Sequence, residues 1–149
     1  MANEITHLGM IGLGRMGGNL VRRVSDAGLH TVAYDISANV VAQLASEHTA
    51  LISAATSIMN LVEQLPTPRA IWIMVPAGIP TDEVVNELIP LLDAGDIVID
   101  GGNSYYRDDL KHSAHAKERG VSFLDVGTSG GIWGLSLIHI SEPTRPERI

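Results

Sequence analysis

The sequence predicts an α/β fold in which a doubly wound, mostly parallel β-sheet carries helices on both faces. Two observations support this fold class. Strand-like and helix-like segments alternate along the chain, which is the order that builds parallel sheets from β-α-β units. Several strand-like segments, such as AIWIMV at 70–75, are apolar throughout, as is typical of strands that are buried on both faces.

Turn and cap residues set the expected boundaries of each element. The expected strands are 5–11, 30–34, 50–53, 70–75, 96–100 and 121–126. The expected helices are 15–27, 38–46, 57–65, 82–92 and 108–119. Ser37 and Thr81 are predicted N-caps of the second and fourth helices. Gly28, Gly95 and Gly120 follow the ends of the first, fourth and fifth helices, where glycine is the preferred terminator.

Composition limits the classes of function. The chain has 149 residues, which fits one domain, and a hydrophobic fraction of 45%. Its formal net charge of −7 argues against a nucleic-acid surface, and no apolar run is long enough to cross a membrane. There is no cysteine, so disulfides and thiol catalysis are excluded. The N-terminus lacks the basic region of a secretory signal, and we expect a cytoplasmic protein.

Two histidines are spaced so that they share a helix face. His112 and His115 lie three positions apart in the expected helix 108–119, a spacing that brings side chains together. No third ligand lies nearby in the sequence. We therefore predict a solvated helix face and no metal site.

A glycine pattern follows the first expected strand and opens the first expected helix. Gly12-x-Gly14-x-x-Gly17 in this position is typical of dinucleotide binding. Gly12 is expected to permit the tight turn, Gly14 to let the backbone approach a pyrophosphate, and Gly17 to let the helix pack closely on the sheet. The helix N-terminus supplies free N–H groups and partial positive charge. This context predicts a Rossmann-type domain.

Asp35 ends the second expected strand, 18 positions after Gly17. The pattern calls for an acid at about this distance, which accepts hydrogen bonds from the adenosine ribose. A carboxylate repels a 2′-phosphate, and the segment YDIS offers no arginine to bind one. We therefore predict NAD rather than NADP as the cofactor. The alternative is that Asp35 merely ends the strand and begins a turn.

Three more loops follow strands at the edge of the sheet where open α/β proteins bind ligands. They are Pro76-Ala77-Gly78, Gly101-Gly102-Asn103-Ser104 and Gly127-Thr128-Ser129-Gly130-Gly131. The Asn103 amide suits a nicotinamide carboxamide or a sugar hydroxyl. Ser129 and the N–H groups of Gly130 and Gly131 suit a carboxylate or phosphate. An asparagine N-cap and a flexible chain end are the alternatives.

Three motifs together resemble one enzyme family. IGLGRMGGNL, DGGNS at 100–104 and VGTSGGIWGL at 126–135 are similar to 6-phosphogluconate dehydrogenase, decarboxylating, over about residues 5–135. The wider β-hydroxyacid dehydrogenase superfamily shares GLGxMG and a serine-glycine-glycine motif, but GGNSYYRDD and GGIWG fit the 6-phosphogluconate branch better. Asp35 resembles the NAD-preferring members.

The resemblance implies an activity and a set of binding residues. Family members oxidise the C3 hydroxyl of 6-phosphogluconate, pass the hydride to the nicotinamide, and release carbon dioxide and ribulose 5-phosphate in the pentose phosphate pathway. The implied substrate contacts are Asn103, Ser129, Gly130 and Gly131. The implied cofactor contacts are Gly12, Leu13, Gly14, Arg15, Met16, Gly17, Asp35, Val75, Pro76, Ala77 and Asn103.

The segment that resembles the family does not include the family's catalytic residues. The family's general base, a lysine, and its proton donor, a glutamate, lie in a helix beyond the last glycine motif and have no counterpart here. Lys111 and Lys117 lie on an earlier helix and are expected to be solvated. We therefore expect that this chain alone is inactive, with no catalytic residue present. We likewise expect this chain to lack the family's all-helical domain, through which a homo-oligomer is expected to form.

The final segment departs from the α/β pattern. SLIHISEPTRPERI, residues 136–149, has no strand or helix period and resembles translated sequencing-adapter sequence. A disordered natural tail is the alternative. We expect residues 1–135 to form a truncated NAD-binding domain, with the sheet incomplete at its C-terminal end.

Two other functions remain open from the sequence. One is a 3-hydroxyacid dehydrogenase of the hydroxyisobutyrate type, which acts on a smaller acid than a phosphorylated sugar acid. The other is a non-catalytic NAD-binding module. No nucleic-acid or membrane partner is expected for any of these functions.

Overall fold

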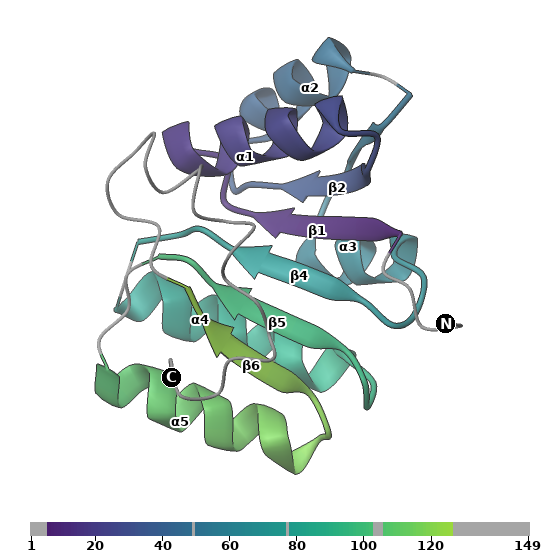
Figure 1. The fold of residues 1–149 in the computed structure, drawn as a ribbon. Coiled ribbons are helices and arrows are strands. Elements are labelled where there is room, and N and C mark those ends of the chain that lie inside the picture. The colour runs from purple at the N-terminus through teal and green to yellow at the C-terminus, as the bar shows by residue number, and fades with distance from the viewer. Residues whose placement is uncertain (1–5, 49, 77, 103–105, 127–149) are drawn as a thin grey trace.

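A six-stranded, wholly parallel sheet forms the centre of the molecule (Figure 1). The computed structural model of the chain describes residues 6–48, 50–76, 78–102 and 106–126. The strands are β1 His7–Ile11, β2 His30–Tyr34, β3 Ile52–Ala54, β4 Ala70–Ile73, β5 Ile97–Asp100 and β6 Ser122–Asp125. Their spatial order is β3-β2-β1-β4-β5-β6.

The order of the strands creates a crevice between β1 and β4. The chain first builds outward from β1 to β2 and β3, and then crosses back so that β4 pairs with the other side of β1. Connections that leave neighbouring strands in opposite directions open a gap beyond their carboxyl ends, where α/β proteins bind ligands. This gap lies directly beyond Ile11 and Ile73, which are paired in register.

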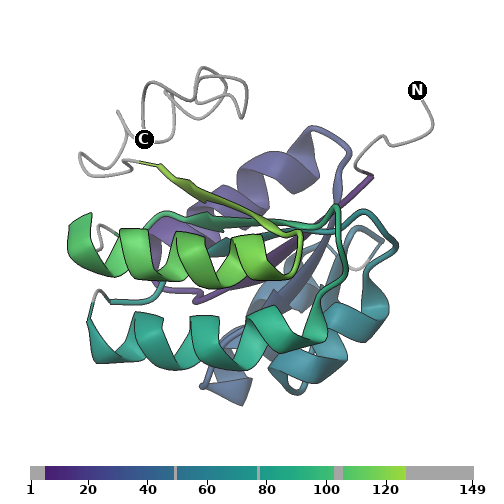
Figure 2. The same cartoon turned by 90° about the horizontal axis from the view of Figure 1, so that it is seen from below.

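Helices cover both faces of the sheet. Helices α1 (Arg15–Asp26) and α2 (Ala38–Glu47) lie on one face. On the opposite face lie α3 (Ile58–Gln64), α4 (Ile79–Leu88) and α5 (Tyr106–Glu118), with a 3₁₀ turn, η1, at Ile89–Leu91. Figure 2 shows α4 and α5 side by side beneath the strands. This is the layered arrangement that strands apolar on both faces require.

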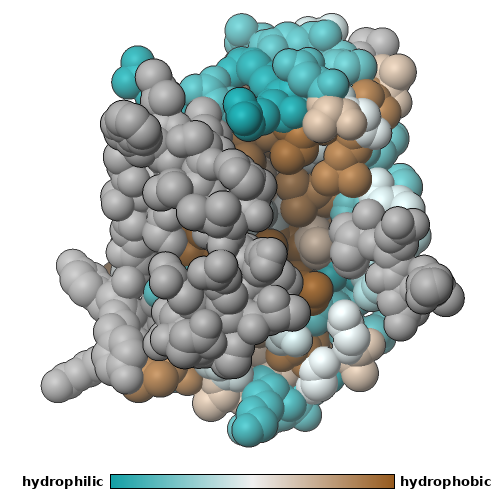
Figure 3. Space-filling view, in the orientation of Figure 1, coloured by the Kyte–Doolittle hydropathy of each residue, from teal (hydrophilic) through white to brown (hydrophobic). Residues whose placement is uncertain are grey.

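Each layer has its own core. Leu61, Ile71 and Val85 belong to the core under α3, α4 and α5, and each is fully buried. Met10 and Val21 are likewise fully buried under α1 and α2. The core under α1 and α2 also contacts the half-buried side chains of Ile99 on β5 and Met74 just after β4. In Figure 3, hydrophobic surface lies over the middle of the molecule, below a hydrophilic cap.

The sequence predictions for most elements are confirmed within two residues, with one larger difference. The fourth helix runs from Ile79 to Leu88 and not from residue 82 to 92, so Thr81 is not its N-cap. A 3₁₀ turn follows at Ile89–Leu91, and Gly95 therefore does not end the helix. Gly78, at φ 93°, makes the turn into the helix, and its carbonyl accepts from the N–H of Asp82. Pro80 fits because the first helical turn has N–H groups without intrahelical partners. The Thr81 hydroxyl instead donates to the carbonyl of Pro76 (2.9 Å).

The other corrections are smaller. β4 ends at Ile73, two residues before the expected end, because its partner β1 stops at Ile11. The carbonyl of Ile11 accepts from the N–H of Met74, and β1 offers no further strand backbone beyond it. Ser37 stands at the N-cap position of α2, but its side chain makes no capping hydrogen bond.

The prediction that His112 lies on a solvated helix face is wrong. Its side chain is buried at 2% exposure between α4 and β6, where it contacts Phe123. A histidine packed against an aromatic ring and paired with an acid from another helix cannot be recognised from its own helix. Among the residues that the structure describes, no cluster of metal-ligating side chains occurs, and no helix combines the length and apolar character needed to span a bilayer.

Candidate functional site: a dinucleotide-shaped pocket at the β1–β4 crevice

The turn that follows β1 is shaped by Gly12. Its φ of 100° is a conformation that side chains disfavour, and an added Cβ would lie 2.7 Å from the carbonyl oxygen of Met74. The Gly12 N–H donates to the carbonyl of Tyr34 at the end of β2 (2.9 Å). Gly12 therefore brings the ends of β1, β2 and β4 together in a tight turn.

Gly17 and Gly14 have different surroundings. A Cβ on Gly17 would collide with the carbonyl oxygen of Gly12, so only glycine lets α1 begin so close to the turn. Around Gly14, by contrast, an added Cβ would meet nothing within 4 Å. Gly14 is also exposed and lines the pocket described below. The open space over Gly14 is what a ligand that approaches the main chain needs.

The N-terminus of α1 faces the same space. Gly14 is the N-cap, and its carbonyl accepts the first helical hydrogen bond, from the N–H of Gly18 (2.8 Å). The N–H groups of the first turn have no partner inside the helix and carry partial positive charge. No acidic residue occupies that turn, so an anionic ligand would meet no carboxylate there.

Asp35 contacts the glycine turn directly. Its Oδ2 accepts from the N–H of Leu13 (2.7 Å), and its Oδ1 accepts from the N–H of Ser37 (2.9 Å). The carboxylate therefore joins the end of β2 to the turn after β1. Asp35 is half-buried and also lines the pocket.

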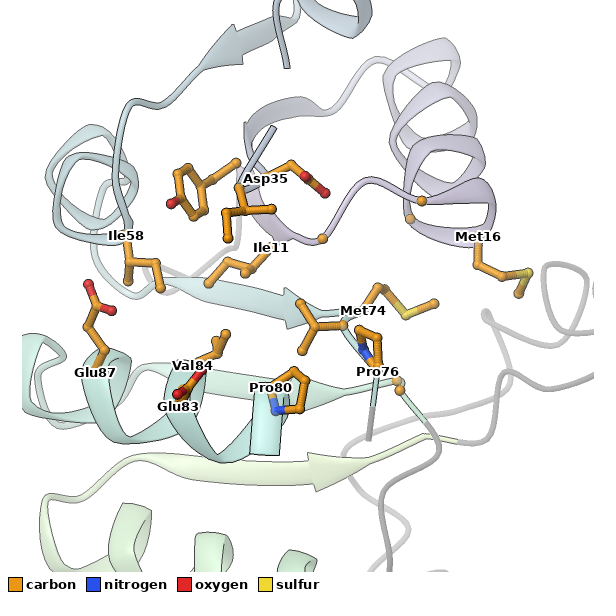
Figure 4. A pocket seen from close by; sticks show the side chains of 18 of the residues that line it. Ile11, Met16, Asp35, Ile58, Met74, Pro76, Pro80, Glu83, Val84 and Glu87 are labelled. Carbon is orange, nitrogen blue, oxygen red and sulfur yellow. The ribbon is translucent and has the colours of Figure 1, made fainter. Parts of the chain in front are cut away.

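A cavity of about 760 Å³ extends over the glycine turn (Figure 4). Residues from β1, α1, β2, α3, α4 and the loops after β4 and β5 line it. They are Ile11, Gly12, Gly14, Arg15, Met16, Gly17, Tyr34, Asp35, Ile36, Ile58, Met74, Val75, Pro76, Pro80, Glu83, Val84, Glu87, Gly101 and Gly102. Its volume falls in the range of cofactor and drug-sized ligand sites.

The pocket has two ends on either side of Asp35. Figure 4 shows Ile58, Val84 and Glu87 gathered at one end, where α3 and α4 approach β2. Met16, Met74 and Pro76 lie toward the other end, beside the glycine turn. The first end offers aliphatic walls for a planar base, and the second offers apolar walls for a second ring. The shape therefore suits an elongated two-ring molecule with a polar centre.

The charged groups on the pocket wall are mostly acidic. Among the described lining residues, Asp35, Glu83 and Glu87 are carboxylates and Arg15 is the single arginine or lysine. Glu83 and Glu87 are one turn apart on α4, and both are exposed to solvent. Two carboxylates at the α3–α4 end make that end unfavourable for an additional phosphate.

The structure brings most predicted cofactor contacts to this pocket. Gly12, Gly14, Arg15, Met16, Gly17, Asp35, Val75 and Pro76 line it. Leu13 does not; its side chain is buried in the core under α1 and α2, and its backbone N–H contacts Asp35. Ala77, Asn103, Ser129, Gly130 and Gly131 lie outside the described residues.

The sequence does not predict the walls of the pocket that come from α3 and α4. Ile58, Glu83, Val84 and Glu87 contribute to it, and no local motif marks them. In a helix that starts at Ile79, four of the lining residues share one face because they are separated by three, one and three positions. They are Pro80, Glu83, Val84 and Glu87. Ile36 also lines the pocket and is 94% exposed. Its position directly after Asp35 is a signal for this role that the sequence does offer.

The groups whose pKa values depart from their ordinary values lie away from the pocket. Burial, and secondarily the charge of His7, lower the pKa of His30. The hydrogen bond between Arg22 and Glu47 raises the pKa of the arginine and lowers that of the carboxyl. These groups join α1 to α2, or lie at the amino ends of β1 and β2, so they bear on folding rather than on ligand chemistry.

The chain is similar to known dehydrogenases over most of its length. Residues 7–137 match the family described as the NAD binding domain of 6-phosphogluconate dehydrogenase. A Haloferax volcanii protein named 6-phosphogluconate dehydrogenase, NAD(+)-dependent, decarboxylating, is 45% identical over 130 residues, which are 87% of this chain and 42% of that protein.

Solved structures share the fold. The 6-phosphogluconate dehydrogenase of Plasmodium falciparum, described as apo, with NADP+ and with 6-phosphogluconate, superposes with a TM-score of 0.78 at 28% identity over 87% of this chain and 28% of that one. A 3-hydroxyisobutyrate dehydrogenase from Salmonella typhimurium gives 0.73 at 26% identity, over 84% of this chain and 42% of that one.

These matches fix the family and the extent of the match. The chain spans less than half the length of each of these proteins. The family match covers the strands, helices and pocket described above. The chain belongs to the family of the NAD binding domain of 6-phosphogluconate dehydrogenase.

Proposed function

We propose that this chain is the cofactor-binding part of an enzyme that oxidatively decarboxylates 6-phosphogluconate, and that its cofactor is NAD. The observation that carries the cofactor site is the cradle formed by Gly12, Gly14 and Gly17. Side chains are excluded at Gly12 and Gly17, while the space over Gly14 is open. A pyrophosphate in that space would meet the free N–H groups of the first turn of α1.

The shape of the pocket supports one orientation of the dinucleotide. With the pyrophosphate over the glycine turn, the adenosine ribose lies at Asp35 and the adenine extends toward Ile58 and Val84. The nicotinamide then extends toward Met74 and Pro76, which line the other end. This orientation fills both ends of the pocket and places the pyrophosphate at the N–H groups of α1 and the adenosine ribose at Asp35.

The preference for NAD is supported by charge. Asp35 faces the position of the adenosine ribose, and Glu83 and Glu87 line the adenine end. A 2′-phosphate would bring about two further negative charges close to these carboxylates, and the repulsion is strongest from the half-buried Asp35 because exposed charges are screened by water and salt. NAD carries only hydroxyl groups there, and these can donate hydrogen bonds to Asp35.

The substrate side rests on the family. The Haloferax volcanii relative is named for 6-phosphogluconate and for NAD(+), and the motifs around Asn103 and Ser129-Gly130-Gly131 resemble that family. We propose these residues as contacts for a phosphorylated sugar acid. The base and the proton donor, a homo-oligomer through a further helical domain, and a cytoplasmic location without nucleic-acid or membrane partners remain predictions from the sequence.

A fusion protein tests this function. Residues 1–135 are joined to the part of the Haloferax volcanii relative that follows its matching segment, and formation of reduced cofactor is followed with 6-phosphogluconate. We expect turnover with NAD and much weaker turnover with NADP. The matched variant Gly17→Ala should lose activity with both cofactors because the turn can no longer close.

Each other outcome points to a different function. Turnover of 3-hydroxyisobutyrate but not 6-phosphogluconate would favour the smaller-acid dehydrogenase, whose fold the Salmonella typhimurium structure shares. A folded fusion that binds NAD without turnover of either acid would favour a non-catalytic module. A preference for NADP would contradict the proposed cofactor.

A further inference from the structure

Asp35 makes two short contacts with backbone N–H groups before any ligand is bound. The N–H of Leu13 donates to Oδ2 at 2.7 Å, and the N–H of Ser37 donates to Oδ1 at 2.9 Å. Both lengths are those of charge-assisted hydrogen bonds. Leu13 lies between Gly12 and Gly14, so the first contact joins the carboxylate to the middle of the glycine turn.

Apart from the buried side chain of Leu13, few other groups hold the turn in shape. Its glycines contribute no side chains, and glycine is the residue that loses the most conformational freedom on ordering. The backbone contacts of the turn are the hydrogen bond from Gly12 to Tyr34 on one side and that from Gly18 to Gly14 on the other. The Leu13–Asp35 contact lies between these two and fixes the residue that connects them.

The carboxylate has capacity for both roles. An ionised carboxylate has about four acceptor positions, and the two backbone contacts use one on each oxygen. The remaining positions are enough for the two hydroxyls of a ribose. Binding the ribose therefore does not require Asp35 to release the turn.

We propose that Asp35 is a positioning residue for the phosphate site as well as the contact for the adenosine ribose. This inference rests on the proposed dinucleotide function. Its ionised carboxylate holds the Gly12–Gly14 turn in the shape that binds pyrophosphate. The choice of sugar and the shape of the phosphate site are therefore coupled through one side chain, and replacing Asp35 to admit a 2′-phosphate disturbs the binding of every dinucleotide.

The Asp35→Asn variant separates this role from simple ribose binding. Asparagine keeps the size of the side chain but offers only one acceptor oxygen, so either Leu13 or Ser37 faces an NH₂ group. The probe is nicotinamide mononucleotide, which has a phosphate but no adenosine ribose. Loss of a negative charge alone would strengthen its binding, whereas a disordered turn would weaken it. The control is Asp26→Asn, which removes an exposed carboxylate near the end of α1.

The experiment combines amide hydrogen exchange and titrations followed by nuclear magnetic resonance on the full chain. In the cofactor-free parent, we expect the Leu13 amide to be protected. In Asp35→Asn, we expect its exchange to be about tenfold faster or more, as loss of a hydrogen bond to a charged group implies. Affinity for nicotinamide mononucleotide should fall together with affinity for NAD and NADP, with no change in Asp26→Asn.

The outcomes that overturn the proposal are distinct from failure of the proposed function. An unprotected Leu13 amide in the parent overturns it without any variant, and so does Asp35→Asn that loses NAD but keeps or gains affinity for nicotinamide mononucleotide. A parent chain with a protected Leu13 amide and no affinity for either dinucleotide would instead contradict the dinucleotide site and leave the structural role of Asp35 supported.

Discussion

Nε2 of His112 in α5 lies 2.7 Å from Oδ1 of Asp82 in α4, and the histidine side chain is almost fully buried. The other ring nitrogen, Nδ1, is buried and has no hydrogen-bond partner among the residues that the structure describes. A proton on Nδ1 would be a buried, unpaired donor, so the proton is assigned to Nε2, which donates to Asp82. This contact ties α5 to the helix that carries Glu83, Val84 and Glu87 into the pocket.

Removing the acceptor at Asp82 should destabilise the protein, whereas an amide should preserve most of the contact. Asp82→Ala leaves the buried N–H of His112 unpaired, at a cost of about 1–3 kcal/mol. Asp82→Asn retains an oxygen that accepts from His112 and should cost less than about 1 kcal/mol. Urea unfolding of both variants checks this, and equal costs for the two would show that the hydrogen bond carries no stability.

Two glycines of the turn should respond differently to alanine. Gly17→Ala places a methyl against the Gly12 carbonyl and should lower the free energy of unfolding by about 1–3 kcal/mol, as overpacking does. Gly14→Ala meets nothing within 4 Å and should cost less than about 1 kcal/mol, since alanine is only a poorer N-cap.

The matched measurement for this pair is NAD affinity. Gly14→Ala should weaken NAD binding about tenfold or more while the fold is retained, because the methyl occupies the space of the pyrophosphate. Gly17→Ala should lose both stability and binding. If Gly14→Ala binds NAD as the parent does, the pyrophosphate does not lie over this turn.

The acidic residues of α4 should discriminate against the phosphorylated cofactor. Neutralising both with Glu83→Gln and Glu87→Gln should raise NADP affinity about two- to tenfold at low salt, with little change for NAD. The gain should shrink as salt is added, because exposed charges are screened. Glu118→Gln, an exposed change on α5, is the control. An equal gain for NAD and NADP would contradict selection by these charges.

His30 should make stability depend on pH. Burial, and secondarily the charge of His7, lower its pKa in the folded protein, so the unfolded chain binds the proton more readily. The neutral His30 leaves the free energy of unfolding at its full value above about pH 6.5, the ordinary histidine value. The free energy of unfolding then decreases as pH falls from that value through the lower folded pKa.

The measurement is thermal unfolding of the parent and His30→Gln between pH 8 and pH 5. We expect the variant to lose less stability on acidification than the parent, since glutamine keeps a polar group near Ser53 (which contacts His30 at 2.9 Å) but does not titrate. His7→Gln should retain most of the parent's pH dependence, because burial is the larger cause. Parallel curves for parent and His30→Gln would contradict this assignment.

The sequence predicted the order of elements because their signals are local. Apolar runs define β1, β4 and β5, and Gly28 and Gly120 adopt the positive φ that ends a helix, whereas Gly95 has a positive φ in the turn before β5 and ends no helix. The glycine turn and Asp35 were found for the same reason, since the spacing in this fold is fixed by one strand, one helix and one strand. The start of α4 is not predicted because a glycine followed by a proline is typical of loops as well as of a first helical turn.

The rest of the pocket depends on contacts that no local pattern encodes. Ile58 and Glu87 come from different helices and line the same pocket only because β4 returns to the side of β1. The burial of His112 depends on Asp82, thirty residues earlier in the chain. The Leu13–Asp35 contact was not predicted either, because a backbone N–H leaves no mark in the amino-acid sequence.

The most direct test of the dinucleotide site is calorimetric titration of the chain with NAD and, separately, with NADP. We expect one NAD bound per chain, with NADP bound more weakly, and we expect NADP binding to improve in the variant that combines Glu83→Gln with Glu87→Gln. The absence of binding to either cofactor by the folded chain, or tighter binding of NADP than of NAD, would contradict it.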